Sequence, residues 1–433
     1  MTAREVARRV LERVERGGAW ATPTLDGELA RAGLDERDRR LASEIVYGVL
    51  RHRTRIDRAI AAHADLKRTP PRVMCVLRVA AYQLLFLDRV PSYAVVDDAV
   101  AAAREASGAK LGGFTNAVLR KLSTAREPAL PASGRERLEI EYSMPAWILD
   151  EMSAAVEAET PADPDSPVPA LRLQELAAAF SLQPPLVARA NRTRTTRDAL
   201  IESLRVTGVT GKPLALAPMA IELEDLGDPA RSPTFNAGLW TVQDTGAQLV
   251  GHLAAPRPGQ RILDACAGVG GKATHLAELT DNSARIDAAD QSETKLDLLE
   301  QTARRLGLTN IHAHVCDLLD PTAQIGDAYD LIILDAPCTG LGVLRRHPDA
   351  KWRLKPTDIT RLAKLQSQLL DSVVRRLAPG GSLVYSVCTF TRAEGPEQIR
   401  SLVARSGLTL AAEHRTWPPE ADGFYVARLE RPR

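Results

Sequence analysis

The spacing of hydrophobic residues divides the chain into three parts with different predicted secondary structure. Residues 1–125 place hydrophobic side chains such as Val6 and Val10 at helical spacing, with arginines between them. In the middle of the chain, a strand pattern that begins at Leu186 is followed by the pattern of a capped helix, which predicts a small α+β element. After Phe235, short hydrophobic runs alternate with helical patterns, which is typical of a doubly wound α/β sheet.

The boundaries between these parts follow from composition. Four prolines lie in the nine residues from Pro161 to Pro169, a density that favours an extended linker or exposed loop. We therefore expect three domains: an all-α N-terminal domain over 1–140, a linker with the small α+β element over 141–235, and a Rossmann-like α/β domain over 236–433.

The α/β part contains five predicted strands, and each is followed by an aspartate or a cysteine at its carboxyl end. The strands are predicted at 260–266, 286–289, 311–316, 331–334 and 382–387. The residues at or just past their carboxyl ends are Cys266, Asp290, Asp317, Asp335 and Cys388. Each of these alone is also typical of a capping acid or a packed cysteine. Because open α/β sheets bind ligands at this edge, the set together favours a site for an adenosine-containing cofactor.

A glycine-rich turn lies between the first of these strands and the helix after it. The turn reads Ala-Gly-Val-Gly-Gly-Lys at 267–272. Glycines allow positive φ angles there and let the backbone approach a ligand closely. Asp290 lies about twenty residues beyond the glycines, the placement used to bind ribose hydroxyls. A lone Gly-x-Gly is weak evidence, but its position between strand and helix supports the cofactor site.

Two thiols decide between classes of cofactor chemistry. Cys338 follows Asp335 on a glycine-containing loop, and Cys388 ends the fifth strand. A dinucleotide oxidoreductase also shows a glycine turn and an acid after the second strand, but it does not need two thiols. C5 of cytosine becomes a good nucleophile once a thiolate adds to C6, and a neighbouring acid stabilises the adduct. The sequence leaves open whether the two cysteines meet.

The formal net charge of +1 conceals an asymmetry along the chain. Residues 1–140 hold 25 Lys and Arg against 18 Asp and Glu, a net charge of +7. Residues 141–433 hold 31 against 37, a net charge of −6. A basic N-terminal domain permits a nucleic-acid partner without proving one.

Cysteine usage and hydropathy bound the cellular setting. The five cysteines form no Cys-x-x-Cys pair, which is typical of a reducing cytosol and predicts no metal site. The N-terminus has no apolar signal core, and the hydrophobic stretch 73–87 is interrupted by Arg78 and too short to span a bilayer. We expect a cytoplasmic protein without a membrane partner, acting as a monomer.

Three segments of the N-terminal part resemble the NusB family. They read Val-Leu-Arg-Val-Ala-Ala-Tyr-Gln-Leu-Leu-Phe-Leu at 76–87, Val-Pro-Ser-Tyr-Ala-Val-Val-Asp-Asp-Ala-Val at 90–100 and Phe-Thr-Asn-Ala-Val-Leu-Arg at 114–120. The resemblance covers most of residues 1–125 and implies a helical domain that binds RNA or protein. It further implies that the excess positive charge of this domain faces RNA.

The remaining motifs resemble the Sun-type RNA cytosine-5 methyltransferases. They are 235–248, Asp-Ala-Cys-Ala-Gly-Val-Gly-Gly-Lys at 264–272, Asp-Ala-Pro-Cys-Thr-Gly-Leu-Gly from 335 onward, Tyr-Ser-Val-Cys-Thr-Phe at 385–390, and the closing strand at 422–429. With the NusB-like part, the resemblance covers nearly the whole chain except about 153–180. It implies methylation of C5 of a cytosine in RNA, with 16S ribosomal RNA as the expected substrate.

The resemblance also implies roles for individual residues. Cys388 matches the family's nucleophile, and Cys338 matches the thiol that helps release the enzyme from the methylated base. Lys272 and Asp335 match residues beside the target base. The residues that match the binding site for S-adenosylmethionine are Cys266, Ala267, Gly268, Val269, Gly270, Gly271, Lys272, Asp290, Asp317 and Asp335.

The chain departs from the family pattern at three places. Gly268 and Val269 replace the family's Ala-Pro in the first loop, which removes the rigidity of the proline. Val387 stands before the nucleophile where the family has Thr, and Arg-Ala-Glu-Gly-Pro-Glu at 392–397 replaces Pro-Glu-Glu-Asn. Every reacting group remains.

Two groups of basic residues are candidates for contact with RNA. The loop 345–353, with Trp352, favours phosphate contacts and base stacking over a solvated surface. The arginines of 189–197 are typical of a solvated face but also suit phosphate contacts.

The sequence leaves two alternative functions. A non-catalytic RNA-binding transcription or assembly factor is one alternative, which the retained thiols and Asp335 disfavour. A small-molecule methyltransferase is another, which the basic residues disfavour.

Overall fold

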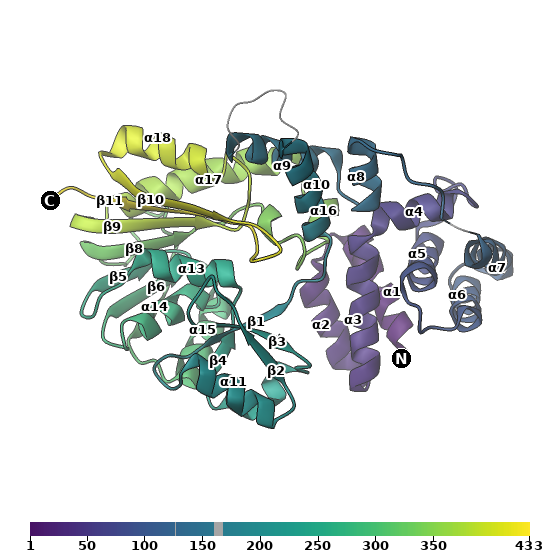
Figure 1. Cartoon of the computed structure of the whole chain (residues 1–433), viewed down its shortest axis with the longest axis horizontal. Helices are drawn as coiled ribbons and strands as arrows, with labels where there is room; N and C mark the ends of the chain where they lie inside the picture. The colour runs from purple at the N-terminus through teal and green to yellow at the C-terminus, as the bar shows by residue number, and fades with distance from the viewer. Residues whose placement is uncertain (126, 160–167) are drawn as a thin grey trace. The chain divides into compact units, whose positions relative to one another are not determined.

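The computed structural model describes residues 1–125, 127–159 and 168–433, and the chain forms two compact units (Figure 1). One unit, here called the helical unit, consists of residues 1–182 together with 344–354. The other, here called the α/β unit, consists of residues 183–343 and 355–433. Of the predicted linker from Pro161 to Pro169, residues 161–167 lie outside the described residues, and the prediction is wrong for 168 and 169, which begin a helix.

The helical unit confirms the helical reading of the N-terminal part. Its helices are α1 (Ala3–Gly17), α2 (Ala21–Ala32), α3 (Glu36–Arg51), α4 (Arg53–Ala61), α5 (Pro71–Phe86), α6 (Ser92–Ser107), α7 (Ala109–Thr124), α8 (Arg135–Glu141), α9 (Ala146–Glu159), α10 (Val168–Phe180) and the short α16 (Ala350–Arg353). Helix α1 begins where the Thr2 side chain accepts a hydrogen bond from the Glu5 amide, and it ends at Gly18 in a left-handed conformation. Its face of Val6, Val10 and Leu11 is buried. Nowhere in the described part of the chain is a helix long and apolar enough to cross a membrane.

Helix α5 is the hydrophobic centre of the helical unit. Almost every residue from Val73 to Gln83 is buried, because other helices pack around it. Arg78 is held inside by two carboxylates, Glu15 at 2.7 Å and Asp57 at 2.7 Å. The hydrophobic stretch 73–87 is therefore a buried helix, as its composition predicted.

Segment 344–354 leaves the α/β part of the sequence and joins the core of the helical unit. The indole Nε1 of Trp352 donates to the carbonyl of Leu50 at 2.7 Å, and its ring packs against the helical core. The Lys351 ammonium donates to the carbonyl of Arg51 at 2.9 Å. Asp349 accepts from the amide of Ala21 at 3.1 Å.

The prediction that the basic loop 345–353 contacts RNA phosphates is wrong for its buried members. Arg345 and Lys351 are each only 2% exposed. Arg353 lies over the ring of Trp20 at 4.1 Å and donates to the carbonyls of Gly18 and Ala19. Lys351 and Arg353 thus contact carbonyls and rings of the protein instead of phosphates.

The α/β unit holds two sheets. The smaller is antiparallel with the order β2-β3-β1-β4, formed by β1 (Leu186–Ala190), β2 (Thr210–Pro213), β3 (Ala220–Glu224) and β4 (Trp240–Val242). Helix α11 (Arg197–Val206) packs on it after a cap by Thr196, which confirms the predicted α+β element. The larger has the order β10-β11-β9-β8-β5-β6-β7, formed by β5 (Arg261–Asp264), β6 (Arg285–Asp290), β7 (Ile311–Val315), β8 (Tyr329–Asp335), β9 (Leu377–Val387), β10 (Thr409–Thr416) and β11 (Phe424–Glu430).

Helices cover both faces of the large sheet (Figure 1). They are α13 (Thr245–Ala254), α14 (Gly271–Leu279) and α15 (Glu293–Leu306) on one face, and α17 (Pro356–Val374) and α18 (Pro396–Ser406) on the other. The short elements η1 (Pro229–Arg231), α12 (Pro233–Asn236) and η2 (Leu341–Val343) lie in connections. Along β8, Leu331 and Ile333 enter one core while Ile332 and Leu334 enter the other, as the period of a strand requires.

We predict that Lys351 makes the stability of the helical unit depend on pH. Burial and the charge of Arg51 lower the pKa of Lys351 to about 7, below its value of about 10.4 in an unfolded chain. Burying the charged form of Lys351 therefore lowers the free energy of unfolding by its full amount below pH 7. This cost shrinks as the pH rises towards 10. When the pH rises from 7 to 9, the free energy of unfolding of the wild-type chain, measured by urea denaturation, should increase by on the order of 2 kcal/mol relative to that of a Lys351→Met variant. An identical pH dependence in the two proteins would contradict this.

Candidate active site

The parallel strands bring the five predicted rim residues to one edge of the large sheet. β7, β6, β5, β8 and β9 are neighbours in that order and run in the same direction. Asp290 and Asp335 are the last residues of their strands, and Cys388 directly follows β9. The first strand ends at Asp264, two residues earlier than predicted, so that Cys266 lies in the turn.

The glycine turn has the backbone shape that its composition predicted. Gly268 has a φ of 53° and Gly270 a φ of 86°, both in the left-handed region. A Cβ on Gly270 would come within 2.5 Å of Leu299, whereas one on Gly268 would meet no atom within 4 Å. Gly270 thus permits close helix packing, and Gly268 faces open space. The amide of Gly270 closes the turn on the carbonyl of Ala267 at 2.9 Å, so the turn forms without the family's proline.

Acids at the ends of the second and third strands border this turn. Asp290 accepts hydrogen bonds from the amides of Gly268 and Ser292, each at 2.9 Å, and therefore fixes the turn. Asp317 lies exposed beyond β7 and accepts from the amide of Leu319 at 2.9 Å. A carboxylate has about four acceptor positions, so both groups keep capacity for a ligand hydroxyl. Burial raises the pKa of Cys266, which makes it a neutral wall of the turn.

A lysine from helix α14 and an acid from strand β8 pair beside the turn. The Lys272 ammonium donates to one oxygen of Asp335. The hydroxyl of Ser386 donates to the other oxygen at 2.8 Å. Burial opposes the charge of Lys272, but the charge of Asp335 and their hydrogen bond raise the pKa of Lys272 overall. The amine is therefore a fixed cation at the edge of the sheet.

The structure brings the two thiols together. The Sγ atoms of Cys338 and Cys388 lie 3.4 Å apart. The hydrogen bond to Cys388 and burial raise the pKa of Cys338, so that Cys338 stays a thiol. Two side chains whose chemistry suits nucleophilic attack and proton transfer thus lie side by side.

Asp264 is a site residue that the sequence reasoning missed. It is completely buried at the end of β5. Burial and then the charge of Asp335 raise the pKa of Asp264 to about 7. Its position inside the Asp-Ala-Cys motif was visible, but a buried acid at a strand end looks the same in sequence as an exposed one.

Arg189 lies inside the α/β unit, so for this residue the expected solvated face and the alternative of phosphate contacts are both wrong. It is 0% exposed and donates to Glu278 at 2.7 and 3.0 Å. It also donates to the carbonyl of Gly271 at 3.0 Å and to Thr274 at 3.1 Å. Arg189 belongs to β1 and its partners to α14, so this side chain fastens the small sheet to the helix that follows the glycine turn. Asn191, also buried, donates to the carbonyls of Gly238 and Leu306.

The sheet order, the glycine turn and the acids beyond it define an α/β methyltransferase class, and family comparisons make the class specific. Residues 252–430 match the model described as 16S rRNA methyltransferase RsmB/F. Residues 1–124 match the NusB family, and 168–228 match the RsmF/B-like ferredoxin-like domain.

Full-length relatives agree with these matches. The chain is 33% identical to the probable ribosomal RNA small subunit methyltransferase B of Synechocystis sp., with 100% of both chains covered. It is 34% identical to ribosomal RNA small subunit methyltransferase B of Vibrio cholerae, covering 93% of this chain and 92% of the relative. The chain therefore belongs to the RsmB/F family of 16S rRNA methyltransferases, the Sun-type family indicated by its motifs.

A solved structure supports the fold across the whole chain. The crystal structure of PH0851 matches with a TM-score of 0.81 and 23% identity, covering 99% of each chain. This likeness confirms the predicted succession of a helical part and an α/β part.

We predict that removing one partner of the buried Arg189–Glu278 pair destabilises the protein more than replacing both partners does. Burial raises the pKa of Glu278, and the charge of Arg189 opposes that rise. Replacing Arg189 by Met leaves a buried acid without its cation and should cost about 3–5 kcal/mol of unfolding free energy. The double variant Arg189→Met with Glu278→Leu should recover much of that loss.

Urea denaturation checks this prediction against an exposed pair of the same kind. Arg205, whose side chain is 70% exposed, pairs with Glu202, and Arg205→Ala should change the free energy of unfolding far less than Arg189→Met does. A double variant less stable than Arg189→Met alone would contradict the assignment.

Proposed function

We propose that this protein methylates C5 of a cytosine in 16S ribosomal RNA, using S-adenosylmethionine and a covalent adduct between a cysteine and C6 of the base. The observation that carries the proposal is the 3.4 Å separation of the Cys338 and Cys388 sulfur atoms beside the glycine turn. Family membership supports the rRNA methyltransferase activity. The atom methylated and the covalent route rest on the thiol pair and its surroundings.

The residues around the glycine turn fit S-adenosylmethionine. The open space over Gly268 suits the close approach of a ligand to backbone. Asp290 and Asp317 have acceptor capacity for ribose and adenine donors, and Asp335 borders the same edge. We assign Cys266, Ala267, Gly268, Val269, Gly270, Gly271 and Lys272 to the wall of this site. When bound there, the cofactor supplies an electrophilic methyl group.

Cys388 is assigned as the nucleophile. Its thiolate forms a bond to C6, and the electron pair of the C5–C6 double bond moves into the ring and becomes available at C5. We assign Asp335, held by Lys272 and Ser386, to the N3 and N4 edge of the base. Its carboxylate accepts from the N4 amino group and, once N3 of the adduct has taken a proton from solvent, from N3 as well, which stabilises the adduct. With the cofactor bound, C5 would take its methyl group, and the bond from the methyl carbon to the sulfonium sulfur would break with its electron pair left on the sulfur.

Cys338 is assigned to release of the product. Its pKa is raised by the hydrogen bond to Cys388, by burial and by that neighbour's charge. When Cys388 becomes a thioether, that charge disappears and Cys338 can lose its proton to solvent more readily. The resulting thiolate accepts the C5 proton, the C5–C6 double bond reforms, and the bond from C6 to Cys388 breaks.

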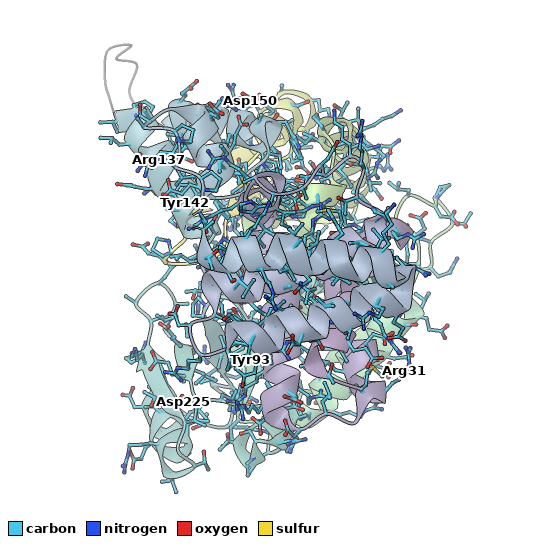
Figure 2. All side chains as sticks on the ribbon, turned by 90° about the vertical axis from the view of Figure 1, so that its right-hand side faces the viewer. Arg31, Tyr93, Arg137, Tyr142, Asp150 and Asp225 are labelled. Carbon is cyan, nitrogen blue, oxygen red and sulfur yellow. The ribbon has the colours of Figure 1, made fainter. Side chains whose placement is uncertain are left out.

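RNA binding is assigned to the basic N-terminal part, and we keep the division into parts 1–140, 141–235 and 236–433 as part of the proposal. The helical unit carries surface side chains such as Arg31 and Tyr93 (Figure 2). Tyr93 is 71% exposed, which suits stacking on an unpaired base. The net charge of +7 over 1–140 supports phosphate contacts.

We predict one 5-methylcytosine in 16S ribosomal RNA that depends on this protein. Bisulfite sequencing of a strain lacking the gene should show loss of protection at a single cytosine, restored by the wild-type gene and not by a Cys388→Ala variant. Unchanged bisulfite protection throughout the rRNA, together with a missing methyl group at another atom, would refute the C5 assignment. Loss of protection in a different RNA would refute the substrate.

We also predict opposite behaviour of the two thiol variants with RNA and S-adenosylmethionine. Cys388→Ala should abolish both methyl transfer and the covalent adduct. Cys338→Ala should trap the adduct as a slowly migrating band on a denaturing gel. Cys75→Ala removes a buried thiol of the helical unit and should leave the band pattern of the wild type. An adduct in Cys388→Ala and none in Cys338→Ala would reverse the two roles.

A further inference from the structure

A buried carboxylate joins the two cysteine-bearing loops. Glu394 lies between β9 and α18 and is 0% exposed. One of its oxygens accepts from the amide of Thr339 at 2.8 Å and from Gln366 at 3.1 Å. The other accepts from the hydroxyls of Thr339 at 2.6 Å, Thr391 at 2.9 Å and Thr389 at 3.3 Å. Five hydrogen bonds from neutral donors replace the water that an ionised carboxylate would otherwise hold.

The positions of these donors relate Glu394 to both thiols. Thr339 directly follows Cys338, and Thr389 directly follows Cys388. The hydroxyls of Thr339 and Thr389 also lie 3.0 Å from each other. One carboxylate therefore fixes the residue after each reacting cysteine.

The two cysteines differ in how else they are held. Cys388 follows β9, which pairs with β8 on one side and β11 on the other, and its carbonyl accepts from Gly342 at 2.9 Å. Cys338 lies in an irregular segment beyond β8. The carbonyl before it, of Pro337, accepts from Gln366 at 2.9 Å, and Gln366 in turn donates to Glu394. The backbone on both sides of Cys338 thus depends on Glu394, directly or through Gln366.

We propose that Glu394 is the positioning residue for the release step, holding the Cys338 thiol against Cys388. This inference rests on the roles proposed above for the two thiols. Without Glu394, Cys388 keeps its strand and can still add to the base. Cys338 loses its anchor, and a displacement of about 1 Å is enough to slow a proton transfer by about 10²-fold.

Replacing Glu394 by glutamine keeps the shape of the side chain and exchanges one acceptor oxygen for an NH₂ donor. Its amide would present an NH₂ group to one of the two sets of donors. The threonine hydroxyls can rotate to accept from it, whereas the Thr339 amide cannot. Glu394→Gln should therefore retain part of the anchor, and Glu394→Ala should lose it.

The experiment compares Glu394→Ala, Glu394→Gln and Cys338→Ala in single and multiple turnovers with RNA. In Glu394→Ala, multiple turnover should fall about 10²-fold while the affinity for S-adenosylmethionine stays within about twofold. The covalent adduct should accumulate, as in Cys338→Ala, and Glu394→Gln should lie between this variant and the wild type. Glu397→Ala is the matched control, because that acid is 46% exposed in a surface ion pair and should leave turnover unchanged.

The ratio of trapped adduct to released methylated RNA decides the outcome, because this ratio does not depend on how much protein is folded. If Glu394→Ala folds too poorly to measure, Glu394→Gln gives the same test with a raised ratio. A wild-type ratio in both, or loss of the adduct with intact cofactor binding, would overturn the proposal. Absence of an adduct in Cys338→Ala would instead overturn the assigned thiol role, independently of Glu394.

Discussion

The α/β unit depends on one buried charge, the guanidinium of Arg189. It satisfies Glu278, Thr274 and the carbonyl of Gly271 at once, with no exposure to solvent. Taking these groups out of water is costly unless every donor finds an acceptor, so these bonds hold the small sheet in its position on α14. That helix begins at the glycine turn. Arg189 therefore helps to fix the shape of the candidate cofactor site through its bonds to α14.

The sequence predicted the parts of the fold and site that depend on short-range patterns. Strand alternation, the glycine turn and acids at strand ends are local, and parallel strands bring their ends together regardless of what lies elsewhere. The neighbourhood of Asp290, Asp335 and Cys388 was predictable for that reason.

Burial of polar residues was not predictable, because it depends on partners far along the chain. Arg189 looked like its exposed neighbour Arg192, yet its partner Glu278 is 89 residues away. Lys351 and Trp352 looked like a nucleic-acid loop, and their partners lie about 300 residues earlier, at Arg51 and Leu50. Glu394 lay in a stretch that departs from the family pattern, and nothing in its immediate sequence announced five hydrogen bonds.

Segment 344–354 has a consequence for the order in which the protein folds during synthesis. Residues 1–182 leave the ribosome first, but Trp352 and Lys351 complete their core only after the 161 residues of 183–343 have been made. At usual translation rates this is a delay of roughly 10 to 30 s. During that time the carbonyls of Leu50 and Arg51 lack their eventual donors. The helical unit is first in the sequence and yet among the last parts of the molecule to be finished.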